Sequence, residues 1–148
     1  MSHDETLKLD DFLCFAVYSA NHAFNRVYKP ILDRLSLTYP QYLAMVTLWD
    51  ADGVTVGQIG ERLMLETNTL TPLLKRLESA GLVRRVRDVS DERQVRIHLT
   101  EKGRGLRQQA EDIPGKIGAC IERDGEAISA LTDELTRVRN TLMARVKP

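Results

Sequence analysis

Residues 54–104 read VTVGQIGERLMLETNTLTPLLKRLESAGLVRRVRDVSDERQVRIHLTEKGR, and this stretch decides the fold. Apolar residues recur at helical spacing over residues 56–63, and Thr55 stands where a helix N-cap belongs. After a polar break, the apolar period resumes over residues 70–77, and Gly81 follows at the position of a helix C-cap glycine. The pattern predicts a helix, a turn and a second helix, which is the candidate reader of a DNA groove.

Two β-capable runs follow, at residues 82–87 and 94–99, with a charged loop at residues 88–93 between them. Two strands joined by a loop directly after a helix-turn-helix predict a winged helix. From Lys75 to Arg96 the chain carries seven cations against four anions, although its formal net charge is zero. The cations are Lys75, Arg76, Arg84, Arg85, Arg87, Arg93 and Arg96, and the anions are Glu78, Asp88, Asp91 and Glu92. This local basic surface favours phosphate contact over the alternative, an ordinary solvated strand face, because a helix-turn-helix lies beside it.

Length and composition bound the class of protein. A chain of 148 residues is expected to form one domain, or one domain with helical extensions. No apolar run approaches the ~18 residues that a membrane span needs, so no membrane partner is expected. The acidic N-terminus lacks an apolar signal core, and we therefore expect a cytoplasmic protein. The two cysteines have no metal-ligand spacing, so we expect neither a zinc site nor another cofactor.

The residues before the helix-turn-helix predict two helices. Residues 9–35 read as one long helix that is apolar on two faces, which indicates that a partner chain covers one of them. Pro30 lies inside this pattern and is expected to kink the helix or to end it. After a break at residues 36–40, with Pro40 in the first turn and Thr38 or Tyr39 just outside, a nearly all-apolar helix at residues 41–49 is expected to pack centrally.

The residues after the wing predict further helices. Thr100 is a plausible N-cap, the pattern of residues 101–123 is weak and contains Pro114, and residues 125–146 form a clear helix. We therefore expect a mainly α fold with a small β wing, in a single domain spanning residues 1–148. Residues 54–100 would form the winged helix-turn-helix DNA-binding unit, and residues 9–35 and 101–146 a helical dimerisation region from both termini.

Three segments carry a resemblance to a known family: TVGQIGERL at residues 55–63, TLTPLLKRLESAGLVRR at 69–85 and SDERQVRIHLTEKGR at 90–104. They resemble the MarR family of winged-helix transcriptional regulators. The triplet Asp91-Glu92-Arg93 fits the acid-x-Arg pattern of the wing tip in that family. LCFAVYSA at residues 13–20 and LTYPQYL at 37–43 look like the branch of organic hydroperoxide resistance repressors. The resemblance covers about residues 7–104 strongly and the C-terminal helices loosely.

The resemblance implies a redox sensor at Cys14, with its thiolate held by tyrosine hydroxyls donated across a dimer. Tyr28 and Tyr39 match those tyrosines, and Tyr18 lies nearby in the sequence. Phenolic donors would stabilise the thiolate, which is the form that reacts with a peroxide. Apolar neighbours on the same helix would favour an organic peroxide. Without the resemblance, a lone cysteine on a helix reads as a small buried apolar residue.

Some members of the branch carry a second cysteine near the end of the chain, and Cys120 lies in a matching region. In such members the sensor is oxidised to sulfenic acid and then condenses with the second thiol of the partner subunit. Pairing of Cys14 with Cys120 is therefore a hypothesis that follows from the resemblance, and a quiet Cys120 is the alternative.

Side chains near the start of the second helix and on the wing are the candidate DNA contacts. Base edges would be read by Asn68, Thr69 and Thr71, near the helix start. Arg93 would enter the minor groove, oriented by Asp91. Thr67 would cap the helix or touch phosphate. Pro72 implies that the helix starts nearer Thr71 or bends there. The full set is Thr67, Asn68, Thr69 and Thr71, with Lys75 and Arg76 as phosphate or packing residues, Arg85 and Arg87 as backbone contacts, and Asp91 and Arg93 at the wing tip.

These observations predict a homodimeric repressor that binds a palindromic operator while Cys14 is reduced and releases it when an organic hydroperoxide oxidises Cys14. One rival is a MarR-type repressor released by a non-covalent phenolic or aromatic ligand, with Cys14 inert. A thiol peroxidase is the second rival, but no arginine or threonine set accompanies Cys14, so we do not expect an enzyme.

Overall fold

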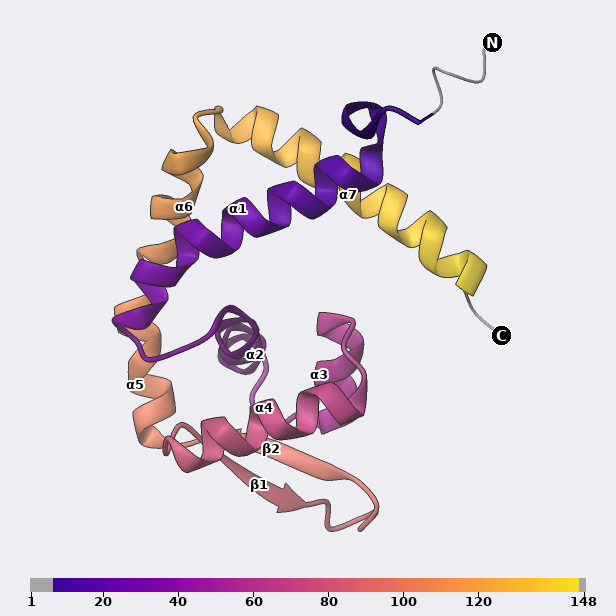
Figure 1. Ribbon diagram of the computed structural model, residues 1–148. Helices are drawn as coiled ribbons and strands as arrows, with labels where there is room; N and C mark the ends of the chain where they lie inside the picture. The colour runs from indigo at the N-terminus through magenta and orange to yellow at the C-terminus, as the bar shows by residue number, and fades with distance from the viewer. Residues whose placement is uncertain (1–6, 147–148) are drawn as a thin grey trace. The chain divides into compact units, whose positions relative to one another are not determined.

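The computed structural model describes residues 7–146, and the chain divides into two compact units after Glu111. It is mainly α-helical with one small antiparallel sheet, as the sequence predicts. Figure 1 shows the elements in chain order. The first unit holds a 3₁₀ turn at Leu9–Asp11, α1 at Leu13–Asp33, α2 at Tyr39–Asp50, α3 at Val56–Leu63, α4 at Thr67–Ser79, β1 at Val83–Arg87, β2 at Val95–Leu99 and α5 at Glu101–Ala110. The second holds α6 at Ile113–Ile121 and α7 at Gly125–Val146.

The first long helix, α1, differs from the expected single helix at residues 9–35. It begins only at Leu13, because Phe12 is extended and separates it from the 3₁₀ turn before it. Pro30 does not end the helix, which continues to Asp33. Leu32 is its one buried residue among those described, so its apolar stripes are left exposed on this chain.

Helix α2 forms the centre of the first unit, as its apolar sequence predicts. A capping box starts it: Gln41 N–H donates to the Thr38 hydroxyl, and the Gln41 side chain accepts from Thr38 N–H. Pro40 occupies the first turn, where its missing N–H costs nothing. Met45 and Leu48 are completely buried.

The helix-turn-helix follows the predicted pattern, with one correction. Thr55 caps α3 through a second capping box with Gln58. Helix α4 begins at Thr67 and not near Thr71, with Glu66 at the N-cap position. Pro72 lies inside the helix, and the one helical bond that it cannot form is to the carbonyl of Asn68, four residues earlier; both residues are exposed.

A glycine ends α4 in the way the sequence indicates. Gly81 has a φ of 77°, a left-handed conformation that suits glycine. Leu82 N–H donates to the Leu77 carbonyl and Gly81 N–H donates to that of Glu78, which is a Schellman motif. The chain therefore leaves the helix in a fixed direction and enters β1 at once.

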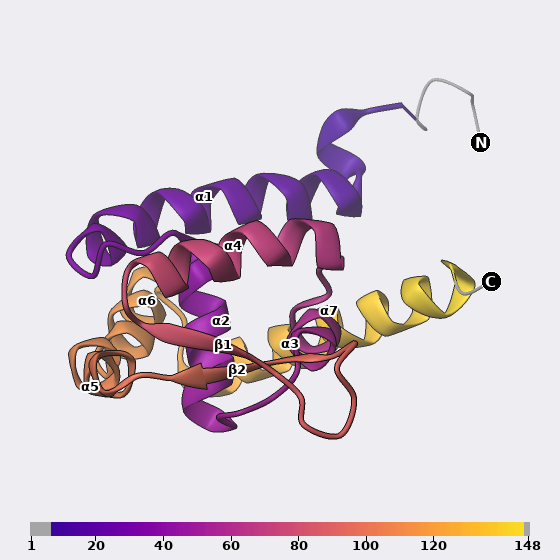
Figure 2. The ribbon, with the colours of Figure 1, turned by 90° about the horizontal axis from the view of Figure 1, so that it is seen from below.

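Strands β1 and β2 form the wing, with Val83 opposite Leu99 and Arg87 opposite Val95. One face of this sheet packs into the core, where Val83, Ile97 and Leu99 are buried. The loop at residues 88–94 projects from the rest of the unit in two perpendicular views (Figures 1 and 2). This is the predicted wing.

The C-terminal residues form separate helices rather than one loose helix at residues 101–123. Thr100 caps α5 by accepting from Gly103 N–H at 3.0 Å, as expected. Helix α5 ends at Ala110, and α6 starts with Pro114 in its first turn, where proline is tolerated. Helix α7 spans the predicted residues, and none of them is buried in this chain.

Candidate nucleic-acid interface and thiol sites

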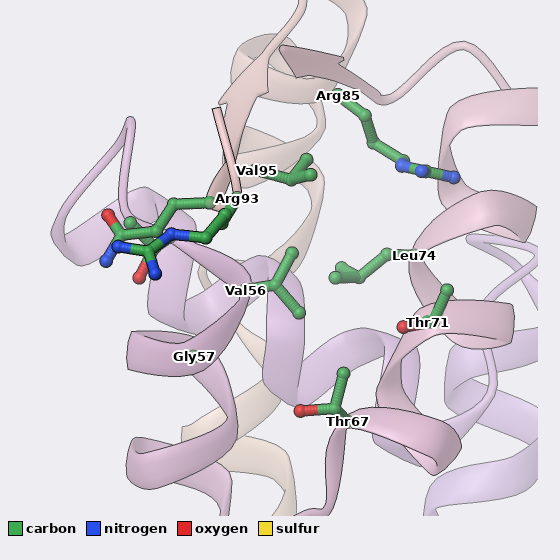
Figure 3. A pocket seen from close by; sticks show the side chains of 10 residues that line it. Val56, Gly57, Thr67, Thr71, Leu74, Arg85, Arg93 and Val95 are labelled. Atoms are coloured by element: carbon green, nitrogen blue, oxygen red, sulfur yellow. The ribbon is translucent and has the colours of Figure 1, made fainter. Parts of the chain in front are cut away.

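A concavity lies between the N-terminal turns of α3 and α4 and the wing. Its volume is about 380 Å³. Figure 3 shows residues that line it: Val56 and the backbone at Gly57 on α3, Thr67 and Thr71 on α4, and Arg85 and Arg93 on the wing. The remaining lining residues are Thr55, Leu74, Gln94 and Val95. Helix N-termini carry unsatisfied N–H groups and partial positive charge, so this surface suits an anionic ligand such as a phosphate.

The predicted contact residues of α4 fall into two groups. Thr67 and Thr71 are one turn apart and both line the concavity. Asn68 and Thr69 are exposed in the first turn but do not line it, and Lys75 and Arg76 are exposed farther along the helix. Thr67 is the first helical residue and not the cap, because Glu66 occupies the cap position.

At the wing tip, Asp91 and Arg93 form a two-point ion pair. Arg93 Nε donates to Asp91 Oδ1 at 3.0 Å and Nη2 donates to Oδ2 at 3.2 Å, while Arg93 N–H also donates to Oδ1 at 3.1 Å. The side-chain hydrogen bonds from Arg93 lower the pKa of Asp91. The Arg93 side chain remains 91% exposed, so the pair holds a charged group out in solvent.

The other wing cations have distinct surroundings. Arg85 lines the concavity, and its N–H donates to the Glu78 carboxylate at 2.9 Å. Arg87 donates to the Glu92 carbonyl at 2.9 Å, which ties the strand to the loop. Sequence reasoning missed Gly57 and Gln94, which also line the concavity. The position of Gly57 in the first turn after a capping threonine was the one signal that could have indicated it.

The two cysteines are free thiols, and both are exposed. Cys14 is the second residue of α1 and lies in the first unit, whereas Cys120 is near the end of α6 in the second. The buried apolar role that a lone helical cysteine usually has therefore does not describe Cys14 in this chain.

Tyr28, Tyr39 and Tyr42 form a cluster of aromatic rings. The ring centroids of Tyr28 and Tyr39 are 4.7 Å apart, and those of Tyr28 and Tyr42 are 5.9 Å apart. Burial, with the neighbouring Tyr39 and Tyr42, raises the pKa of Tyr28 to about 12. Burial also raises the pKa of Tyr39 and of Tyr42. The three phenols are therefore protonated near neutral pH and can act as hydrogen-bond donors. Sequence reasoning did not assign Tyr42 to this group.

The cluster lies far from the thiol of the same chain. Cys14 and Tyr28 are fourteen residues apart in α1, which corresponds to about 21 Å along the helix axis. Tyr18 is apart from the cluster too, with its ring edge-on to His22 at a centroid distance of 4.4 Å. A tyrosine of the cluster can therefore reach a Cys14 thiol only if that thiol belongs to another chain.

Two further features are absent from residues 7–146. Among them, no group of three or more histidine, cysteine or acidic residues is placed to hold a metal ion. No helix in this range combines the length and the apolar character needed to cross a membrane.

A helix-turn-helix followed at once by a two-stranded wing, with basic side chains around the concavity between them, defines a winged-helix DNA-binding protein. The SarA/Rot family of transcriptional regulators matches residues 26–110. The chain belongs to this SarA/Rot and MarR type of winged-helix transcriptional regulators.

Individual relatives match nearly the whole chain. It is 50% identical to the transcriptional regulator TtmR of Methylorubrum extorquens, over 96% of this chain and 73% of the relative. It is 45% identical to the organic hydroperoxide resistance transcriptional regulator of Bacillus subtilis, over 92% of each chain. The solved structure of reduced AbfR bound to DNA is 33% identical, with a TM-score of 0.84 over 99% of this chain and all of that one. A disulfide-containing form of AbfR is 37% identical, with a TM-score of 0.64 over 95% of this chain and 96% of that one.

Proposed function

We propose that this regulator is a repressor that binds a palindromic operator as a homodimer and releases it when an organic hydroperoxide oxidises Cys14. The observation that carries the proposal is an exposed Cys14 thiol near the start of α1 and a tyrosine cluster, formed by Tyr28 of α1 with Tyr39 and Tyr42 of α2, far from it in the same chain. A two-fold dimer can bring the cluster of each chain to the thiol of the other, which a single chain cannot do.

The exposed apolar stripes on the long helices support a dimer. On α1, Leu13, Val17 and Phe24 are all at least 40% exposed. On α7, Leu131, Leu135 and Leu142 recur at helical spacing and are exposed as well. Apolar surface of this extent favours burial against a partner chain. The single-domain arrangement of residues 1–148, with both terminal regions forming the dimer interface, remains part of this proposal.

DNA would be read by the concavity and its surroundings. Thr67 and Thr71, with Asn68 and Thr69 beside them, would face base edges in the major groove, and Lys75, Arg76, Arg85 and Arg87 would meet phosphates. Arg93, presented by Asp91, would enter the minor groove. Because the chain as a whole has no net charge, its attraction to DNA would come from the local excess of cations in residues 75–96.

The sensing chemistry would proceed in two balanced steps. The Cys14 thiolate attacks the peroxide oxygen of ROOH, the O–O bond breaks, and with one proton the products are Cys14 sulfenic acid and ROH. The sulfur is oxidised by two electrons and the peroxide is reduced. The Cys120 thiol of the partner chain then attacks the sulfenic sulfur, which forms a disulfide and releases water. Tyr28 and Tyr39, with Tyr18 nearby, would stabilise the initial thiolate as donors. Solved disulfide and DNA-bound reduced forms of AbfR support this scheme.

The test needs a DNA probe, for which we choose a duplex selected from a random-sequence pool by the reduced protein and labelled with fluorescein (the selected duplex). We expect cumene hydroperoxide to abolish binding of the wild type and to leave Cys14→Ser binding unchanged, as measured by fluorescence anisotropy. Cys120→Ser should still be oxidised at Cys14 but form no disulfide-linked dimer on non-reducing gels. Full peroxide release of Cys14→Ser would contradict the sensor role.

The same titration tests the ligand-controlled repressor, and a separate assay of peroxide consumption tests the thiol peroxidase. The concavity combines apolar residues such as Val56 and Leu74 with two arginines, which would suit an aromatic carboxylate. Release of the selected duplex by sodium salicylate in Cys14→Ser, without release by peroxide, would favour the ligand-controlled repressor. Peroxide consumption by far more than one equivalent, in the presence of dithiothreitol, would favour a thiol peroxidase.

A further inference from the structure

Arg96 is one of the wing cations, but its position separates it from the others. Side chains alternate between the two faces of a strand, so Arg96 shares a face with Val86, which is opposite it in the register. Arg85 and Val95, which line the concavity, lie on the other face. Arg96 is therefore on the sheet face turned away from the DNA-reading concavity.

The Arg96 side chain connects two loops. Its Nη1 donates to the Gly53 carbonyl, before α3, at 2.8 Å. Its Nε lies 3.5 Å from Asp88 Oδ1, at the start of the wing loop. The Asp88 side chain is only 12% exposed, and its Oδ1 also accepts from Ser90 N–H at 3.3 Å within that loop. One guanidinium thus joins the segment that starts α3 to the loop that presents Arg93.

Backbone hydrogen bonds reinforce this connection. Ile97 N–H donates to the Val54 carbonyl at 2.9 Å, Gly53 N–H donates to the Ile97 carbonyl at 3.0 Å, and Thr55 forms a bridge with Arg96. Thr55 is the N-cap of α3. The start of α3 and the base of the wing are therefore held together by main chain, and Arg96 extends that hold to the wing loop.

We propose that Arg96 is a positioning residue for DNA recognition, which sets the wing loop, and Arg93 with it, relative to α3 and α4. It is not assigned as a phosphate ligand, because two of its three guanidinium nitrogens, Nε and Nη1, contact Asp88 and the Gly53 carbonyl. The inference rests on the wing contact proposed above. Arg96 would therefore affect DNA affinity only by positioning Arg93.

The first test asks whether a positive charge alone suffices at residue 96. Lysine keeps the charge but cannot span two acceptors with a planar fork. We expect Arg96→Lys to weaken binding of the selected duplex about tenfold, the size expected for loss of one groove contact. Arg84→Lys is the matched control on the same sheet face, and it should change binding less than about twofold. Equal, small effects of the two variants would overturn the proposal, since a phosphate ligand tolerates lysine.

The second test uses Asp88→Asn, which removes a negative charge from the wing. Charge alone predicts tighter DNA binding for this variant. The proposed connection predicts weaker binding of the selected duplex, because Arg96 loses its ionic partner and the wing loop its anchor. Unchanged or tighter binding would overturn the proposal.

A double-mutant cycle separates positioning from loss of folding. In an Arg93→Ala background, Arg96→Lys should cost less than about twofold, because the contact it positions is already absent. A loss through misfolding would persist in that background and would appear in urea unfolding followed by Trp49 fluorescence. Additive effects would overturn the inference and leave the wing contact intact. Wild-type affinity of Arg93→Ala itself would instead contradict the wing contact, and the inference with it.

Discussion

At the scale of single residues, the wing tip is a charged group that the protein orders in solvent. Asp91 accepts three hydrogen bonds from Arg93, and these lower the pKa of the carboxyl group. Since the pKa of the folded state is depressed, the interaction is present above the ordinary aspartate value of 3.8 and is lost as the pH falls through the lower value of the folded protein. The Asp91 carboxyl group is therefore ionised near neutral pH, as the ion pair requires.

This ordering predicts a change that NMR can measure. The ¹³C resonance of the Asp91 carboxyl group should titrate below 3.8 in the wild type and move back towards that value in Arg93→Ala. Arg87→Ala, which removes an arginine bonded to a wing-loop carbonyl instead, serves as control and should leave the Asp91 pKa unchanged. An Asp91 pKa that is the same in wild type and Arg93→Ala would show that the pair does not form in solution.

The tyrosine cluster gives a second prediction at this scale. If Tyr28 donates to the Cys14 thiolate of a partner chain, Tyr28→Phe should slow oxidation by cumene hydroperoxide about tenfold or more, the size expected for a hydrogen bond to a charged group. The rate is measured by stopped-flow trapping of the sulfenic acid with dimedone. Tyr42→Phe, in the same cluster but outside the proposed donor set, is the control. Equal rates for wild type and Tyr28→Phe would remove Tyr28 from the sensor.

At the scale of elements, α5 contains two glycines with opposite surroundings. A Cβ at Gly103 would lie 2.1 Å from the Leu82 carbonyl oxygen, whereas a Cβ at Gly105 would meet nothing within 4 Å. The absent side chain at Gly103 lets α5 approach the end of the helix-turn-helix. The Trp49 indole N–H also donates to the Gly103 carbonyl at 2.9 Å, so three elements meet at this point.

The two glycines predict substitutions of opposite sign. Gly103→Ala should lower the free energy of unfolding by at least about 2 kcal/mol, because backbone must move to admit the methyl group. Gly105→Ala should raise it by about 0.5–1 kcal/mol, the gain expected for alanine over glycine inside a helix. Urea unfolding at matched protein concentration measures both. A tolerated Gly103→Ala would mean that α5 packs less closely than described.

Local sequence signals determined most of these elements. Thr55 and Thr100 are followed by the helices they were expected to cap, and Thr38, one of two residues expected just outside α2, is its cap. Gly81 follows α4 in a left-handed conformation that few other residues adopt. The expectations of one helix from residue 9 and of one helix over residues 101–123 failed, because in each case a short irregular segment interrupts the pattern. Of the two alternatives for Pro72, a start of α4 near Thr71 is excluded, because the helix begins at Thr67. The extended backbone at Phe12 has no periodic signature.

Part of the candidate site was also predictable from local sequence signals. Residue type and spacing indicated Thr67, Thr71, Arg85 and Arg93 as contacts, and all four line the concavity. The alternation of side chains across the wing, which turns Arg96 away from it, depends on strand register, and a charge count cannot reveal that register.

At the scale of the whole molecule, the exposed apolar stripe of α7 predicts the oligomeric state. Leu135→Arg places a charge in this stripe and should shift sedimentation from dimer towards monomer and weaken binding of the selected duplex by at least about tenfold, since two half-sites would no longer be bound together. Asn140→Arg adds the same charge on the opposite side of the helix and should leave the sedimentation coefficient unchanged. A dimeric Leu135→Arg would place the interface elsewhere.

The wing has one further property, which concerns association with other proteins. A two-stranded sheet offers two open edges to any extended segment nearby. Here the N–H groups of Ile97 and Leu99 on one edge are occupied by the Val54 carbonyl and the Asp52 carboxylate, and that of Arg85 on the other edge by Glu78. A stray strand would therefore find fewer free donors at these positions. The hairpin can thus project into solvent for a nucleic acid to meet while resisting growth into an intermolecular sheet.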